Sequence, residues 1–465
     1  MDNMEKLKEK LKLYLSTLSE SAQRMLLRNL EKAQREGNSD TAAELIVAAL
    51  RDLLKVQEKI VPLEEFAKKD FFREARFFTS EIDLLSKVEA RISPTSFDVI
   101  WSWIKRDIAT PEHLQKLALD CADLEKHEIS KHSAEVCADL VAAIKARLKV
   151  VSRELGGEQK LTNHLGGEIV YKDLLDVLVS AERLMPLKPI LSRMPKEVAS
   201  WSSPEGDEAY KLITRYVQQA PLRTSWLFSA VSKKLLSPRL RIQLATKLSG
   251  SDDAIQVAAT VYAPAVQHML AEMDAHVAEV DKHLKEFSGL HNALDHLRSW
   301  SVLAKAVEVE LEVPNQSQWG GVLTEMRKKM SRILKSEVES APGLVRKALR
   351  APKSGEPESV DSDLIVDAVR ASQIFHQAEL AKDGLAMNGP IAEARKELEQ
   401  SFEILTKSLV DRTRRAVGQD VEVIEKLHVA ALDIAKNLFD AEFADSLGRQ
   451  LKAAASVKEL QAAEA

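Results

Sequence analysis

The sequence predicts an all-α protein, and three observations support that prediction. Hydrophobic residues make up 45% of the 465 residues and charged residues 29%, while aromatic residues reach only 5%, a composition that favours packed helices over a disordered chain. Between prolines and glycines, apolar residues recur at spacings of three and four, the period of an amphipathic helix. Strand-like alternation bounded by the turn dipeptides of β-hairpins does not recur, and Asn388-Gly389 is followed by Pro390 and another helical pattern. We therefore expect an elongated assembly of antiparallel helical hairpins and bundles.

Residues 1–155 are expected to form an N-terminal domain of helical hairpins. Thr110 stands before Pro111, a pair that predicts a helix start because the hydroxyl caps a free N–H and proline needs none at the first position. Two glycine pairs at 155–168 then predict a flexible connection. The stretches with helical periodicity are 3–37, 40–59, 62–79, 81–91, 95–108 and 111–154.

A second helical domain is expected over residues 169–340, where Ser203-Pro204 and Ser237-Pro238 mark two helix starts. Its longest regular pattern spans 266–294 and predicts one long helix that packs against a partner helix, in this chain or in a second copy that self-associates through it. The positions of this heptad pattern are Val266, Leu270, Met273, Val277, Val280, Leu284, Phe287, His291 and Leu294.

The C-terminal part is expected to consist of a linker, a bundle and a tail. Residues 341–363 are rich in Pro, Gly, Ser and charge, which is typical of a flexible linker. Residues 364–456 contain three helical stretches, and a three-helix bundle is the natural packing for them. Residues 457–465 are expected to be a disordered tail.

Charge and cysteine content restrict the class of protein. The 66 basic and 71 acidic residues give a net charge of -5, which argues against a general attraction to nucleic acid. The N-terminus lacks the apolar run of a secretory signal. Residues 254–271 carry no Asp, Glu, Lys or Arg, but their many small and polar residues predict a buried helix rather than a membrane span. Two cysteines fit a reducing compartment, so we expect a cytoplasmic location.

The segment from Cys121 to Cys137 contains both cysteines and, between them, His127 and His132. If this segment forms one helix, the two thiols lie about 24 Å apart and the two histidines diverge by about 140°. A single metal ion cannot reach such ligands. We expect Cys121 to be a buried apolar residue, and we assign no metal and no cofactor here.

A second group of ionisable residues lies on one side of the predicted long helix, at steps of three and four. We expect it to form a hydrated flank, because bundle metal sites use Glu-x-x-His on two helices and the chain has only Glu425 to His428. One alternative stays open, a metal-dependent helical enzyme that uses His276, Glu279 and His283. The full group is His268, Glu272, His276, Glu279 and His283.

Five phenylalanines fall within thirteen residues, and on a helix they point in at least three directions. Either neighbouring helices surround them or some of them form a docking patch for a protein partner. The candidate contact residues from this group are Phe71, Phe72, Phe77 and Phe78.

A basic amphipathic segment runs from Arg327 to Lys353, where nine basic residues and two glutamates give a local charge of 9 minus 2, or +7. Such a segment is suited to an acidic protein first, and otherwise to an anionic membrane surface or to nucleic acid. The candidate contact residues are Arg327, Lys328, Lys329, Arg332 and Lys335.

The motifs that identify common enzymes are missing from the sequence: it has no Gly-x4-Gly-Lys-Ser/Thr, no Gly-x-Ser-x-Gly and no His-Glu-x-x-His. No catalytic residue is therefore assigned. We expect a non-enzymatic intracellular scaffold or adaptor that binds other proteins. The first alternative is a peripheral membrane protein that uses the basic helix, and the second is the metal-dependent enzyme.

Overall fold

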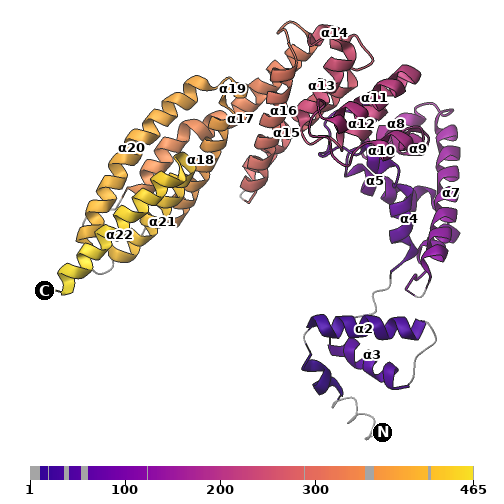
Figure 1. The fold of residues 1–465 in the computed structure, drawn as a ribbon, viewed down its shortest axis with the longest axis horizontal. Helices are drawn as coiled ribbons and strands as arrows, with labels where there is room; N and C mark the ends of the chain where they lie inside the picture. Colours follow the sequence, from indigo (N-terminus) through magenta and orange to yellow (C-terminus); the bar gives the residue numbers. More distant parts are fainter. Residues whose placement is uncertain are drawn as a thin grey trace. The chain divides into compact units, whose positions relative to one another are not determined.

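The computed structural model describes residues 11–18, 20–35, 41–53, 61–122, 124–286, 288–350, 361–416 and 420–463. These residues form helices joined by turns and four isolated backbone bridges, without a strand (Figure 1), which confirms the all-α prediction. The chain divides into two compact units. The first contains residues 1–71 and 104–150, and the second contains residues 72–103 and 151–465.

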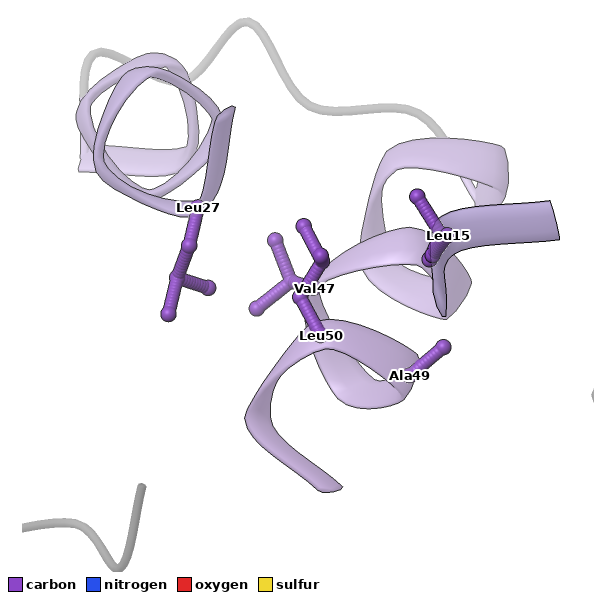
Figure 2. Close-up of a cluster of buried hydrophobic side chains, with 5 residues drawn as sticks. All are labelled: Leu15, Leu27, Val47, Ala49 and Leu50. Atoms are coloured by element: carbon purple, nitrogen blue, oxygen red, sulfur yellow. The ribbon is translucent and has the colours of Figure 1, made fainter. Parts of the chain in front are cut away.

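In the first unit, α2 (Glu20–Arg35) and α3 (Thr41–Leu53) pack around a small apolar cluster. Figure 2 shows Leu27 of α2 facing α3, with Leu15 contributed by the helical residues 11–16. The Gln23 side-chain amide donates to the Leu15 carbonyl at 2.9 Å, so a buried polar group also ties α2 to the preceding turn. The cluster consists of Leu15, Leu27, Val47, Ala49 and Leu50.

The rest of the first unit contains α4 (Leu63–Phe71), the π-helical turn η2 (Ile104–Ile108), α6 (Pro111–Leu117) and α7 (Lys126–Val151). Thr110 caps α6 as predicted, accepting from the His113 amide at 3.3 Å.

The expected helix 111–154 is interrupted, because α7 starts only at Lys126. Cys121 therefore precedes this helix and Cys137 lies within it, so the premise of one continuous helix was wrong. Cys121 is buried as expected. The two thiols donate to the carbonyls of Leu119 and Ala67, at 3.7 and 3.3 Å.

The second unit begins with residues 72–103, which include η1 (Ala75–Phe78) and α5 (Ser96–Trp103). The expected helix 81–91 was wrong, because residues 79–95 form an irregular loop. Serine hydroxyls bond to the backbone here in place of a helical ladder. Ser80 Oγ donates to the Ile82 carbonyl at 2.7 Å, and Ser93 Oγ accepts from the Leu84 amide at 3.1 Å.

Short helices follow, and several start where the sequence predicts. Ser203 and Ser237 cap α11 and α13, accepting from backbone amides at 3.1 and 3.3 Å. The expected flexible connection 155–168 contains a short helix, with Gly166 and Gly167 at positive φ directly after it. The helices are α8 (Gly157–His164), α9 (Glu168–Leu184), α10 (Lys188–Arg193), α11 (Pro204–Gln219), η3 (Pro221–Arg223), α12 (Thr224–Ser232), α13 (Pro238–Ser249) and α14 (Ala254–Ala258).

The heptad pattern 266–294 does not form one helix, so this expectation was wrong. It divides between α15 (Pro264–Lys285) and α16 (Leu290–Glu310), which pack along each other within the chain (Figure 1). Gly289 permits the turn, because a Cβ at this position would lie 2.3 Å from the His283 carbonyl oxygen. Within the described ranges, no helix combines the length and apolar content that crossing a bilayer requires.

The C-terminal helices form one bundle that includes α17 (Gln318–Leu349). Figure 1 shows α17 beside the later helices, so the expected three-helix bundle over 364–456 has further members. The third stretch divides at Asp440, whose carboxylate accepts from the Phe443 amide at 2.7 Å. The later helices are α18 (Ser362–Leu380), α19 (Lys382–Leu385), α20 (Asn388–Arg415), α21 (Asp420–Leu438) and α22 (Ala441–Ala463).

The expected linker 341–363 is also shorter than predicted. α17 runs through the buried Pro342 to Leu349, and α18 starts at Ser362, while 351–360 lie outside the described residues. The expected disordered tail 457–465 was wrong for residues 457–463, which continue α22, and the last two residues are not described.

Candidate functional site

The phenylalanine group does not form one exposed patch. Phe72 and Phe78 are buried, so the expectation that they belong to a docking patch was wrong. Phe72 packs on Phe97 with ring centroids 4.8 Å apart, and Phe78 packs edge-on against Trp226 at 4.7 Å. Phe71, in the first unit, is partly buried, and Phe77 is 42% exposed.

The loop 79–95 is fixed in the second unit by a buried carboxylate of α9. Asp173 is fully buried and accepts from three donors: Lys87 Nζ at 2.6 Å, the Ser93 amide at 3.0 Å and Ser96 Oγ at 2.6 Å. Lys87 also pairs with Asp176 at 2.6 Å. Burial raises the pKa of Asp176, although Lys87 opposes that shift. The loop is thus held by a charged network and is not a loose connection.

A second buried network joins the same loop to α13 and α15. Glu272 forms ion pairs with Arg91 and, at 2.7 Å, with Arg241. Burial, together with repulsion from Arg241, lowers the pKa of Arg91 to about 9, so its guanidinium stays charged at neutral pH. One turn earlier, the His268 ring lies 3.0 Å from the Glu89 carbonyl.

The expected hydrated flank was wrong for the first three of its five residues, which these contacts bury. His268 is 3% exposed, Glu272 2% and His276 8%. The heptad helix was expected to bury only its apolar positions, but the loop 79–95 covers part of its polar side. The sequence gives no local signal for this, because Arg91 and Glu272 are roughly 180 residues apart.

His268 should make the stability of the protein fall as the pH falls. Burial and the nearby Arg91 hold the pKa of His268 well below 6.5, whereas the unfolded chain takes up a proton near that pH. The unfolded state then binds more protons, so the free energy of unfolding decreases below pH 6.5. In His268→Gln, we expect the loss between pH 7 and pH 5 to be smaller by up to about 2 kcal/mol.

Urea unfolding at several pH values measures this difference. His291→Gln is the control, because the His291 side chain is 87% exposed and lies outside the buried network. Parallel pH curves for the wild type and His268→Gln would contradict the assignment.

Adjoining hollows run along the first half of α17, and we call them together the α15–α17 groove. The three hollows have volumes of about 630, 960 and 290 Å³. Two of them also contact α15 and residues 85–88, whereas the largest is bounded by Asn315 and Ala386 instead. The first two share Gly321 and Glu325, the first and third share Asp274 and Lys329, and the last two share Arg332.

Most of the predicted basic residues border this groove, but acidic neighbours engage them. Arg327 pairs with Glu308. Lys329 pairs with Asp274 at 3.3 Å. Two further pairs are Lys328 with Glu325 at 2.9 Å and Lys335 with Glu339 at 3.8 Å.

Arg332 differs from the other basic residues of this set. It is exposed and forms no ion pair with any residue in the part of the chain that the structure describes. The net basic character that the sequence predicts for the groove is therefore concentrated at this position.

A separate cluster of possible metal ligands lies where α15 and α16 pack together. Glu279, His283 and His296 each offer one ligand atom, and these atoms lie within 4.8 Å of one another. His296 and His276 approach with their Nδ1 atoms 3.0 Å apart. Burial, reinforced by His296, lowers the pKa of His276 to about 4. Burial also lowers the pKa of His296.

Helical spacing predicted Glu279 and His283 as candidate ligands but not His296. Ser288-Gly289 could have been interpreted as a helix break. The residues after this break would then have been placed on a second helix, which packs against α15. No protein-family description, curated protein or solved structure matches this chain.

Proposed function

We propose that the protein is a non-enzymatic, cytoplasmic helical adaptor whose α15–α17 groove binds a helical segment of an acidic protein partner. The observation that carries the proposal is a hollowed, largely apolar surface at which one cation, Arg332, forms no ion pair with any described residue and lies at the junction of two of the hollows. An amphipathic helix laid in an apolar groove is a common mode of peptide recognition.

Apolar side chains from both long helices form the floor of the groove. Leu270 and Ala271 belong to α15, and Val322, Met326 and Ile333 belong to α17. Val322 is 41% exposed, so it offers apolar area that a partner can bury. Burial of such area drives association, at roughly 25 cal/mol per Å² before the entropic cost of binding.

Charge supports an acidic partner at one position. A partner carboxylate beside Arg332 would form a charge-assisted, bidentate hydrogen bond at the edge of an apolar surface. The other basic residues of the set are already paired, so they supply little further attraction. For the same reason we place the adaptor ahead of a peripheral membrane protein, which needs several free cations against anionic lipid.

Affinity capture with full-length variants tests the proposal. Arg332→Glu and Val322→Glu should each abolish capture of a partner that the wild type retains, because the first reverses the free charge and the second places a carboxylate in the apolar floor. Lys347→Glu is the matched control. Lys347 is exposed on the same helix and does not line the groove, so this variant should keep the partner.

Equal capture by Arg332→Glu, Val322→Glu and Lys347→Glu would contradict binding in the groove. Flotation with phosphatidylserine vesicles separates the membrane alternative, since salt-sensitive flotation that Arg332→Glu removes would support a lipid surface instead.

A further inference from the structure

The cluster at the α15–α16 contact has the ligand types and the spacing of a metal site. Glu279 and His283 are four residues apart on α15, which places both side chains on one face of the helix. The Glu279 carboxylate oxygen lies 3.2 Å from His283 Nε2. This separation is close to that of two ligands bound to one ion at about 2.0–2.1 Å.

α16 supplies the third ligand. The ring of His296 lies parallel to that of His283, with an interplanar angle of 6° and centroids 5.7 Å apart. Each histidine also has a ring nitrogen within 4.8 Å of a Glu279 carboxylate oxygen. Two imidazoles and one carboxylate from two packed helices form a typical set of three protein ligands for Zn²⁺.

Both histidines also have an outer partner that orients the ring. His283 Nδ1 bonds to the Glu286 carboxylate at 2.8 Å, which leaves Nε2 directed toward Glu279. His296 Nδ1 bonds to His276 Nδ1 at 3.0 Å, which leaves its Nε2 unengaged by that contact. Metal-binding histidines characteristically bond their second nitrogen to a carboxylate, a backbone carbonyl or water, and Glu286 supplies such a carboxylate.

We propose that Glu279, His283 and His296 bind a divalent transition-metal ion, for which Zn²⁺ is the best match, with at least one coordination position left to water. His276 and Glu286 are positioning residues for the two imidazoles. The ion would join α15 to α16 beside their connecting turn. This inference goes beyond the adaptor function and does not depend on the α15–α17 groove.

One contact competes with the ion. Lys282 Nζ lies 2.9 Å from the Glu279 carboxylate, but its side chain is 58% exposed and can move into water at small cost. His283 and Glu279 retain 14% and 27% exposure, so an ion can reach them from solvent. The cluster is thus accessible, although most of each ligand is covered.

Titration calorimetry of the full-length protein with ZnCl₂, after treatment with a chelator, tests the site. We expect the wild type to bind one Zn²⁺ at this site, with a rise in the melting temperature on binding. Glu286→Gln should weaken binding by about 10–100-fold, the loss typical of an outer partner. Glu279→Gln and His296→Gln should weaken it further, because each removes a ligand.

His291→Gln is the control, since His291 also lies on α16 but its side chain is 87% exposed and outside the cluster. It should bind Zn²⁺ as the wild type does. Circular dichroism of each variant shows whether it is folded, and if His296→Gln fails to fold, the more exposed Glu279→Gln and Glu286→Gln decide. Unchanged binding in Glu279→Gln, equal losses in His291→Gln, or no stoichiometric binding by the wild type would each overturn the proposal.

Discussion

Replacing Glu272 with Gln should lower the free energy of unfolding by about 3–5 kcal/mol, the cost of breaking a buried ion pair from one side. Glu272 is 2% exposed and is the carboxylate that pairs with both Arg91 and Arg241. The glutamine side chain has the same shape as that of Glu272 but carries no negative charge. Arg241 would keep its contact with Glu81 at 3.3 Å, but Arg91 would lose its ion pair. The two buried guanidinium groups would then repel each other, and few water molecules could approach to screen them.

Urea unfolding measures this loss, with Asp281→Asn as the matched control. Asp281 lies on the same helix and pairs with Lys285, but both side chains are well exposed. Its replacement should cost no more than about 1 kcal/mol. A loss in Glu272→Gln as small as that of the control would refute the buried network.

Replacing Asp173 with Ala should cost about 3–5 kcal/mol and loosen the loop 79–95. The change leaves the Lys87 ammonium, the Ser93 amide and the Ser96 hydroxyl without their common acceptor. Because Asp176 still pairs with Lys87, the loop should open locally before the whole unit unfolds.

Hydrogen exchange reports both effects. The Ser93 amide should lose protection more than amides in the core of α9 do, while the unfolding midpoint in urea falls. Glu168→Gln, on the exposed start of α9, is the control and should change neither measurement. If Ser93 keeps its protection in Asp173→Ala, the carboxylate does not hold the loop.

Local chemistry was enough to predict the fold class and many helix starts. Thr110, Ser203 and Ser237 cap helices in the structure because a hydroxyl before proline satisfies a free N–H with no help from distant residues. The prediction failed where distant residues decide. Ile82 and Leu84 are buried while Leu85 is 53% exposed, an arrangement that depends on α15 and not on helical spacing.

The candidate sites show the same distinction between what local spacing predicts and what distant residues decide. Spacing along α15 placed Glu279 beside His283, because residues four apart on a helix share a face. His296 could not be assigned from that spacing, since it reaches the cluster only after the chain turns at Gly289. Arg332 was identified as one of five equivalent basic residues, and only the ion pairs of its neighbours distinguish it.

The division of the second unit between residues 72–103 and 151–465 affects how the chain can fold during synthesis. Arg91 leaves the ribosome roughly 180 residues before Glu272, a delay of about 10–35 s at typical translation rates. Until then, Arg91 lacks its carboxylate partner, while Lys87 and Phe78 gain theirs earlier, when Asp173 and Trp226 emerge. A nascent chain halted near residue 155 should therefore bind chaperones through residues 72–103 and release them only as α15 emerges.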